Sequence, residues 1–176
     1  ILYSVWYFQI EKITTQELKS IQNQLLSKNI EFTWEEKAAS GFPYRIEKKL
    51  YNINFKFNNT NFHTKELKII YQPWNKKHII FLIPNDINIL HSNKKLTIHN
   101  SKILASLKID KFSHSRISIT SDKIVFNLNK NVYDFNKIEI HLQTKAIEDL
   151  QFAILIENFS FPPVFIKDNA INKLSI

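Results

Sequence analysis

A chain of 176 residues with 44% hydrophobic side chains is long enough for one domain with a hydrophobic core and too apolar to be mainly disordered. Gly41 is its only glycine, which argues against the Gly-rich phosphate loops of dinucleotide-binding and P-loop enzymes. The net charge of +8 suggests a nucleic-acid partner, but Arg45 and Arg116 are the only arginines among 24 basic residues. We therefore expect no nucleic-acid partner. The same charge suits a weak attraction to an anionic membrane surface.

The first ten residues, Ile1 to Ile10, are apolar and aromatic, but a membrane-spanning helix needs about 20 residues. Two interpretations stand side by side. The segment is the outer end of a membrane anchor or signal helix, with Trp6 and Tyr7 at the membrane interface, or it is a buried first element of the domain. Methionine is absent even from position 1, which indicates that Ile1 is not the natural start.

One amphipathic helix follows. Thr14 and Glu17 fit a capping box, with Thr14 as the N-cap. Apolar side chains then recur on one helical face, at Leu18, Ile21, Leu25 and Leu26. Lys28 suits the last turn and Asn29 is a reasonable stop, so the pattern predicts a helix from Thr15 to Lys28.

After this helix the hydrophobic period changes to two, which predicts about ten strands between Ile30 and Ile156. The run from His78 to Ile83 is apolar on both faces and predicts a more central strand, ended by Pro84. The alternating sets are Ile30/Phe32/Trp34, Tyr51/Ile53/Phe55/Phe57, Leu67/Ile69/Tyr71, Ile87/Ile89, Leu96/Ile98, Ile103/Ala105/Leu107/Ile109, Ile117/Ile119, Ile124/Phe126/Leu128, Ile138/Ile140/Leu142 and Leu150/Phe152/Ile154/Ile156.

These elements predict a mainly β (α+β) fold: a long antiparallel meander sheet curled into a groove, sandwich or barrel, with one amphipathic N-terminal helix. A second helix is expected near Phe165 to Lys173, and Ile171 to Ile176 has strand-like composition. No linker divides the chain, so residues 11–176 form a single β-rich domain. We expect the domain to continue beyond Ile176.

The segment from Ala38 to Glu47 is the one local signature. Gly41 can take a positive φ, and Pro43 forces Phe42 to be extended. In the hairpin that this predicts, Trp34 and Ile46 point inward, whereas Glu35 and Arg45 pair on the outer face. The segment is either a structural corner of the sheet or a docking corner.

Catalytic and metal-binding motifs are absent from the sequence. The six histidines, at positions 63, 78, 91, 99, 114 and 141, form no short metal-ligand pair, and there is no cysteine to join them. There is no G-x-S-x-G nucleophile elbow, and Glu35-Glu36 and Glu148-Asp149 read as solvated charge at strand ends. We expect no catalytic residue, no metal and no cofactor, and hence no enzyme.

An apolar sheet face is the remaining candidate site. Large side chains that would point one way if the strands share a sheet are Phe55, Phe57, Ile69, Ile80, Leu107, Phe126, Ile140 and Ile154. One helix is too small to cover ten strands. The face is therefore either a closed core or a groove that fits a long acyl chain, with lysines at its rim against phosphate headgroups.

The marker turn Ser40-Gly41-Phe42-Pro43-Tyr44-Arg45, preceded by a helix and Trp34, resembles that of domain of unknown function 2125, an uncharacterised alphaproteobacterial family. The Gln72-Pro73-Trp74 stretch is also similar, and the likeness runs from about Val5 to the Phe159–Pro163 segment. It departs in composition, since relatives are richer in Gly, Ala and Arg. The resemblance implies a cell-envelope protein with one N-terminal inner-membrane anchor and its β-domain in the periplasm, and it supplies no catalytic residues.

Two functions follow as expectations. The first is a non-enzymatic envelope protein that binds lipid or lipopolysaccharide-like molecules along the apolar sheet face. The second is a periplasmic scaffold or assembly protein that contacts other proteins through its sheet edges. A cryptic enzyme ranks third.

Overall fold

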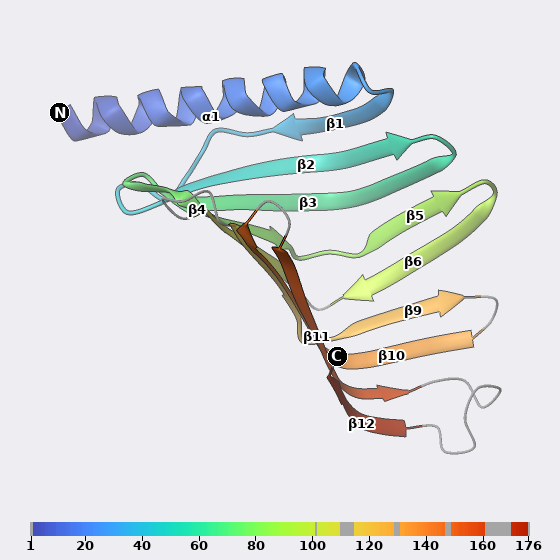
Figure 1. Ribbon diagram of the computed structural model, residues 1–176. Coiled ribbons are helices and arrows are strands. Elements are labelled where there is room, and N and C mark those ends of the chain that lie inside the picture. Colours follow the sequence, from blue (N-terminus) through green and yellow to red (C-terminus); the bar gives the residue numbers. More distant parts are fainter. Residues whose placement is uncertain are drawn as a thin grey trace.

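The computed structural model describes residues 2–100, 102–109, 115–128, 131–146, 149–160 and 170–175. Within them the chain forms one helix, α1 (Leu2–Leu26), and then strands only (Figure 1), so the predicted mainly β class with an N-terminal helix is confirmed. The strands are β1 (Ile30–Glu36), β2 (Ile46–Phe57), β3 (Thr60–Gln72), β4 (Asn75–Ile83), β5 (Ile87–His91), β6 (Lys94–Asn100), β7 (Ile103–Ile109), β8 (Ser115–Ser121), β9 (Ile124–Leu128), β10 (Asn131–Ala146), β11 (Asp149–Ser160) and β12 (Ala170–Ser175).

All twelve strands belong to one antiparallel sheet. Strand β3 pairs with β4 through residues 68–72 and with β5 through residues 60–64, and β10 likewise pairs with both β8 and β9. The pairs β4/β5, β6/β7 and β8/β9 therefore act as the two halves of long bent strands in a meander. The pairings of β3 with both β4 and β5 make the arrangement ring-like, but β1 and β12 each have one partner among the described strands, so the sheet is not a clean barrel.

A corner runs across the sheet where the long strands bend. Pro84 to Asp86 separate β4 from β5, and Asp122 and Lys123 separate β8 from β9. Asn52 in β2 and Asn158 in β11 take positive φ angles of 49° and 48°. A left-handed residue interrupts the strict alternation of a strand, much as a bulge does. As a result, β5, β6 and β9 turn away from the direction of β4 and the first half of β11 (Figure 1).

The helix begins at Leu2, thirteen residues before the predicted start at Thr15. Thr14 is not the N-cap: its hydroxyl lies inside α1 and donates to the carbonyl oxygen of Ile10 at 2.9 Å. The apolar residues before it extend the helix because they bury against the sheet, with Tyr7 and Ile10 only 3% and 4% exposed. The predicted end is close, since α1 stops at Leu26 and Asn29 takes a left-handed φ of 59°.

The second predicted helix is wrong where it can be checked. Residues 170–173 belong to strand β12, which pairs with β11, and residues 165–169 lie outside the described residues. Pairing with β11 satisfies the backbone groups of this segment, and such tertiary context overrides local helix propensity.

The backbone of the marker turn has a positive φ at Gly41, as predicted from the glycine. Gly41 has φ of 97°, and its carbonyl accepts a hydrogen bond from the amide of Arg45 at 3.0 Å. A Cβ at this position would lie 2.7 Å from the carbonyl oxygen of Arg45, so any larger residue meets both backbone strain and a clash. Ile46 is fully buried and Trp34 packs against the core, as expected.

The predicted pairing of Arg45 with Glu35 is wrong. Glu35 lies opposite Tyr51 in the β1–β2 ladder, and residues 37–45 form a long connection before β2 begins. Arg45 instead forms an ion pair with Glu47, at 3.3 Å between its Nη2 and the carboxylate. The alternation of apolar residues indicated which faces the side chains occupy but not the length of this connection.

Candidate functional site

The buried core lies where α1 crosses one part of the sheet. We call the side of the sheet on which α1 lies the inner face. The core joins the helix to β2 and β3, through Tyr7, Ile10, Ile46, Leu50, Ile53, Ile69 and Tyr71. Leu50 and Ile53 both belong to it although they are three positions apart, an odd spacing that puts two residues of a regular strand on opposite faces. The bend at Asn52 therefore keeps apolar side chains on the inner face on both sides of the corner.

A buried lysine connects the helix to the sheet. Lys48 is 1% exposed, and its Nζ donates to Thr15 on α1. The same ammonium lies 3.2 Å from the carboxylate of Glu36 at the end of β1 and 3.8 Å from that of Glu11 on α1. The lysine charge is thus neutralised by one carboxylate from the helix and one from the neighbouring strand.

Two tyrosines make further polar contacts under the helix. The hydroxyl of Tyr7 donates to the carbonyl of Ser40 at 2.9 Å, which ties the start of α1 to the marker turn. Tyr71 on β3 shares a hydrogen bond with Thr14. Burial raises the pKa of Tyr71, and the negative charge of Glu17 adds to this effect, while the Thr14 hydrogen bond acts in the opposite direction.

A small apolar pocket opens beside these contacts, between α1 and strands β3 and β4. Its volume is roughly 170 Å³, which is about that of five or six water molecules. The polar groups at its wall come from Thr14, Glu17 and Tyr71. The rest of its lining is aliphatic or aromatic: Ile13, Leu18 and Ile21 from the helix, and Ile69, Ile79 and Phe81 from the strands.

The inner face remains apolar beyond the helix. The strand register places directly opposed residues on the same face, and it aligns two apolar rows across six strands. One row is Ile69, Phe81, Ala105, Ile119, Ile140 and Ile154; the other is Tyr71, Ile79, Leu107, Ile117, Leu142 and Phe152.

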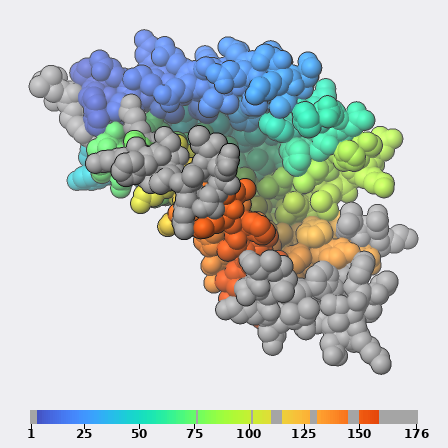
Figure 2. Space-filling view, in the orientation of Figure 1, coloured from blue at the N-terminus to red at the C-terminus, as the bar shows by residue number. Residues whose placement is uncertain are grey.

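The core cluster ends before these rows do. Ile79 and Phe81 on β4 pack against it, but none of its members among the described residues comes from β7, β8, β10 or β11. At the far end of the second row, Phe152 is 61% exposed. Figure 2 shows a recess below the helix, between the β2–β3 and β5–β6 hairpins and the strand β11.

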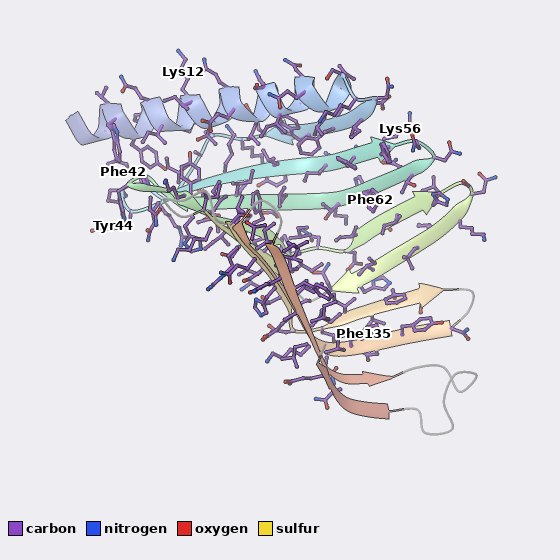
Figure 3. All side chains as sticks on the ribbon, viewed as in Figure 1. Lys12, Phe42, Tyr44, Lys56, Phe62 and Phe135 are labelled. Carbon is purple, nitrogen blue, oxygen red and sulfur yellow. The ribbon has the colours of Figure 1, made fainter. Side chains whose placement is uncertain are left out.

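Aromatic rings continue the inner face past the corner. Phe126 of β9 stacks on Tyr133 and Phe135 of β10, with ring centroids 4.9 and 5.8 Å apart. On β1 to β3, Phe55 contacts both Phe32 and Phe62 edge to face. Figure 3 labels Phe62 and Phe135 on these two parts of the sheet.

The outer face, opposite the two apolar rows, is largely polar on β7, β8, β10 and the start of β11. His78 bonds to the hydroxyl of Ser106 at 2.9 Å, and His141 bonds to that of Ser118 at 3.0 Å. Arg116 donates to the side-chain oxygen of Gln143 at 3.1 Å. The half of the sheet formed by β7, β8, β10 and the start of β11 is therefore amphipathic.

The predicted apolar residues divide between these surfaces. Ile69, Leu107, Ile140 and Ile154 share the inner face, in the two rows above. The expectation that Ile80 joins them is wrong: Ile80 lies opposite Ile70 and Ser106 and so belongs to the outer face, because β4 is apolar on both sides. Phe55, Phe57 and Phe126 lie beyond the corner, and Phe57 is exposed near the end of its hairpin.

Sequence reasoning missed the helix side of the site. Of the pocket residues on α1, the capping box places Thr14 and Glu17 at the start of a helix, whereas they lie in its middle, and Ile13 precedes the predicted helix. Ile117 and Leu142 of the second row occurred in the alternating sets, but their alignment depends on strand register, which the alternation alone does not determine.

The histidines are spread over the sheet. Besides His78 and His141, His91 bonds to Thr60 and His99 to Asp86, each at 2.7 Å. His114 lies outside the described residues. In the described part of the chain no three His, Asp or Glu residues gather as metal ligands. No helix in the same residues is long and apolar enough to cross a membrane.

The fold and its inner face define a β-rich, single-sheet protein with an N-terminal helix. The chain belongs to the family described as "Uncharacterized protein conserved in bacteria (DUF2125)", whose model matches residues 8–163. That range includes the marker turn, the pocket and both apolar rows. Comparisons with curated proteins and with solved structures give no match.

Proposed function

We propose that this protein is a non-enzymatic protein of the bacterial cell envelope that binds the acyl chains of lipid or lipopolysaccharide-like molecules on its inner face. The observation that supports this most is the pair of apolar rows that continue from the helix pocket across β7, β8, β10 and β11, past the end of the core cluster. Apolar rows that no described helix covers favour an apolar ligand.

The energetics favour a long ligand over a small one. Each buried methylene contributes about 0.8 kcal/mol, so a chain lying along several strands gains affinity with its length. The helix pocket is too small for a whole acyl chain, but it opens onto the inner face and suits the end of one. The chain has 24 basic and 16 acidic side chains, and this positive net charge favours a lipid with an anionic headgroup.

The membrane setting is part of the same proposal. An N-terminal inner-membrane anchor that ends within residues 1–10 would place the β-domain in the periplasm, next to the lipid source. Tyr7 and Ile10 pack in the core, as expected if residues 1–10 are a buried first element of the domain. Val5 and Phe8 on the same helix are exposed. The anchor remains a prediction.

A scaffold function is the second candidate, because β11 has a partly free edge. Strand β12 pairs with residues 155–160 of β11, and among the described residues nothing pairs with that edge of residues 149–154. An extended segment of another envelope protein could add as a strand there. Exposed Leu150 and Phe152 would contribute apolar contacts.

Paired substitutions on the same two strands test the lipid proposal. Leu107→Gln with Ile154→Gln polarises the inner face, whereas the control, Leu104→Gln with Leu155→Gln, changes the outer face of the same strands. Native mass spectrometry after incubation with phospholipid should show bound lipid for the wild type and the control. The inner-face variant should lose it. Equal lipid binding by both variants, or none by the wild type, would overturn the proposal and favour the scaffold.

A further inference from the structure

The exposed aromatic side chains are not spread evenly over the molecule. At the end of the sheet where α1 begins, Phe8 is 65%, Tyr44 76% and Trp74 59% exposed. Val5, Trp6 and Phe42 are also exposed there. We call these six residues the aromatic end. The strongly exposed Trp and Tyr side chains of the described chain lie at this end, while Trp34 packs against the core.

Three separate chain segments are held together at the aromatic end. The Tyr7 hydroxyl bonds to the Ser40 carbonyl, and the Tyr7 ring lies edge-on to Phe42 at 5.1 Å, so the start of α1 and the marker turn are in contact. Ile46 lies opposite Tyr71, which places the β3–β4 turn with Trp74 at the same end of the strands. Figure 3 shows Phe42 and Tyr44 below the first turns of α1.

The charges near this end are mainly positive. Arg45, Lys77, Lys108 and Arg116 lie in the marker turn or toward the same ends of β4, β7 and β8, and all four are exposed. Two of the described carboxylates nearby are ion-paired, Glu47 with Arg45 and Lys49, and Glu11 with Lys48. Glu17 is exposed at the wall of the pocket beside Tyr71. The basic side chains named here outnumber these carboxylates, so this end offers an excess of positive charge to an anionic surface.

From this arrangement we infer that the aromatic end docks on the surface of an anionic lipid bilayer. Trp and Tyr have an apolar ring with a polar atom, which suits the boundary between headgroups and acyl chains. Lysine and arginine beside them attract anionic headgroups. Among the described residues, the opposite end of the sheet lacks this combination: its exposed apolar residues Phe57, Leu90 and Val132 include no Trp or Tyr.

Docking in this way places the inner face at the bilayer. The pocket between α1, β3 and β4 includes Tyr71, one residue from the end of β3, so its opening lies near the bilayer surface when Trp74 is inserted. In this respect the inference deepens the lipid-binding proposal. The docking itself does not require a ligand on the inner face.

Vesicle co-sedimentation tests the inference. The wild type should bind vesicles of phosphatidylcholine mixed with phosphatidylglycerol, and bind vesicles of phosphatidylcholine alone more weakly. The variant Phe8→Ser/Tyr44→Ser/Trp74→Ser should bind the mixed vesicles about tenfold more weakly or worse. The matched control at the other end, Phe57→Ser/Leu90→Ser/Val132→Ser, should bind as the wild type does. Equal binding by the two triple variants, or no binding by the wild type, would overturn the inference.

Tryptophan quenching by brominated lipids locates the contact in a protein whose aromatic end is intact. Trp34→Phe retains Trp6 and Trp74, and its fluorescence should be quenched by vesicles with brominated acyl chains. Trp6→Phe/Trp74→Phe retains Trp34, which should not be quenched. Quenching of Trp34 but not of the other two would contradict docking through this end. The inner-face variant Leu107→Gln/Ile154→Gln should still dock, so failure of lipid binding and failure of docking are separable.

Discussion

The two halves of the sheet carry the same apolar alternation but differ in what covers it. On β2 and β3, under α1, Ile46 and Leu50 are fully buried and a lysine is enclosed with its carboxylates. On β10 and β11 the equivalent inner-face rows remain half-buried, and Phe152 is mostly exposed. Alternation therefore specifies a face, while the covering element decides whether that face becomes a core or remains a surface.

The two halves should differ most in how much free energy of unfolding they lose when a leucine on the inner face is truncated to alanine. Leu50→Ala should lower the free energy of unfolding by about 3 kcal/mol, because it leaves a cavity in a closed core. Leu142→Ala on β10 should cost about 1 kcal/mol or less, since its site is partly exposed and the apolar area lost is smaller. Urea unfolding of both variants measures this; equal losses would mean that the second half is also closed.

The buried ion pair should rank next. Lys48→Ala removes the enclosed ammonium and leaves Glu36 and Glu11 without their partner, at a cost of about 2–3 kcal/mol, since both carboxylates keep some contact with water. The exposed pair Lys56–Glu31 is the control, and Lys56→Ala should cost about 0.5 kcal/mol or less. A Lys48→Ala variant as stable as Lys56→Ala in the same urea titration would contradict the role given to Lys48.

Gly41→Ala should have a moderate effect, because the marker turn supports the covered half. The positive φ and the clash with the Arg45 carbonyl predict a loss of about 1 kcal/mol or more. Asn158→Gly at the corner in β11 also has positive φ, and there glycine relieves strain and should be close to neutral. An unchanged melting temperature for Gly41→Ala would show that the turn tolerates a side chain.

The smallest expected effect depends on pH. The pKa of Tyr71 is raised in the folded protein, mainly by burial, so the folded state holds its proton more tightly than the unfolded state does. This contribution to stability is complete below the unfolded pKa of about 10 and declines as pH rises through the folded pKa. Tyr71→Phe should therefore lose less stability than the wild type between neutral pH and pH values above 10. Parallel pH profiles of the melting temperature would contradict this assignment.

The sequence predicts much of the fold and less of the site. Period-two patterning located the strands, and the apolar run ending at Pro84 correctly predicted a strand with partners on both sides. It did not predict the corner, because a single left-handed residue such as Asn52 changes the phase of alternation without a distinctive composition. It also placed Ile80 on the inner face, since a strand that is apolar on both sides gives no signal for its register.

The helix shows a similar limit. Thr14 and Glu17 have the residue types of a capping box, yet Tyr7 and Ile10 bury well before them and extend the helix toward the N-terminus. Local capping signals are outweighed when the preceding residues gain a tertiary contact. This tertiary contact decides which half of the sheet α1 covers. Local sequence patterns therefore do not predict the covered half.

Single-cysteine labelling tests the central claim, an uncovered inner face that lipid occupies, most directly. The chain has no cysteine, so Ile140→Cys on the inner face of β10 and His141→Cys on the outer face each provide one thiol. Without lipid, N-ethylmaleimide should modify both, and Ile140→Cys the more slowly because its site is half-buried. With added phospholipid, Ile140→Cys should become protected while His141→Cys stays reactive. Protection of Ile140→Cys without lipid, or the same reactivity with and without lipid, would contradict the claim.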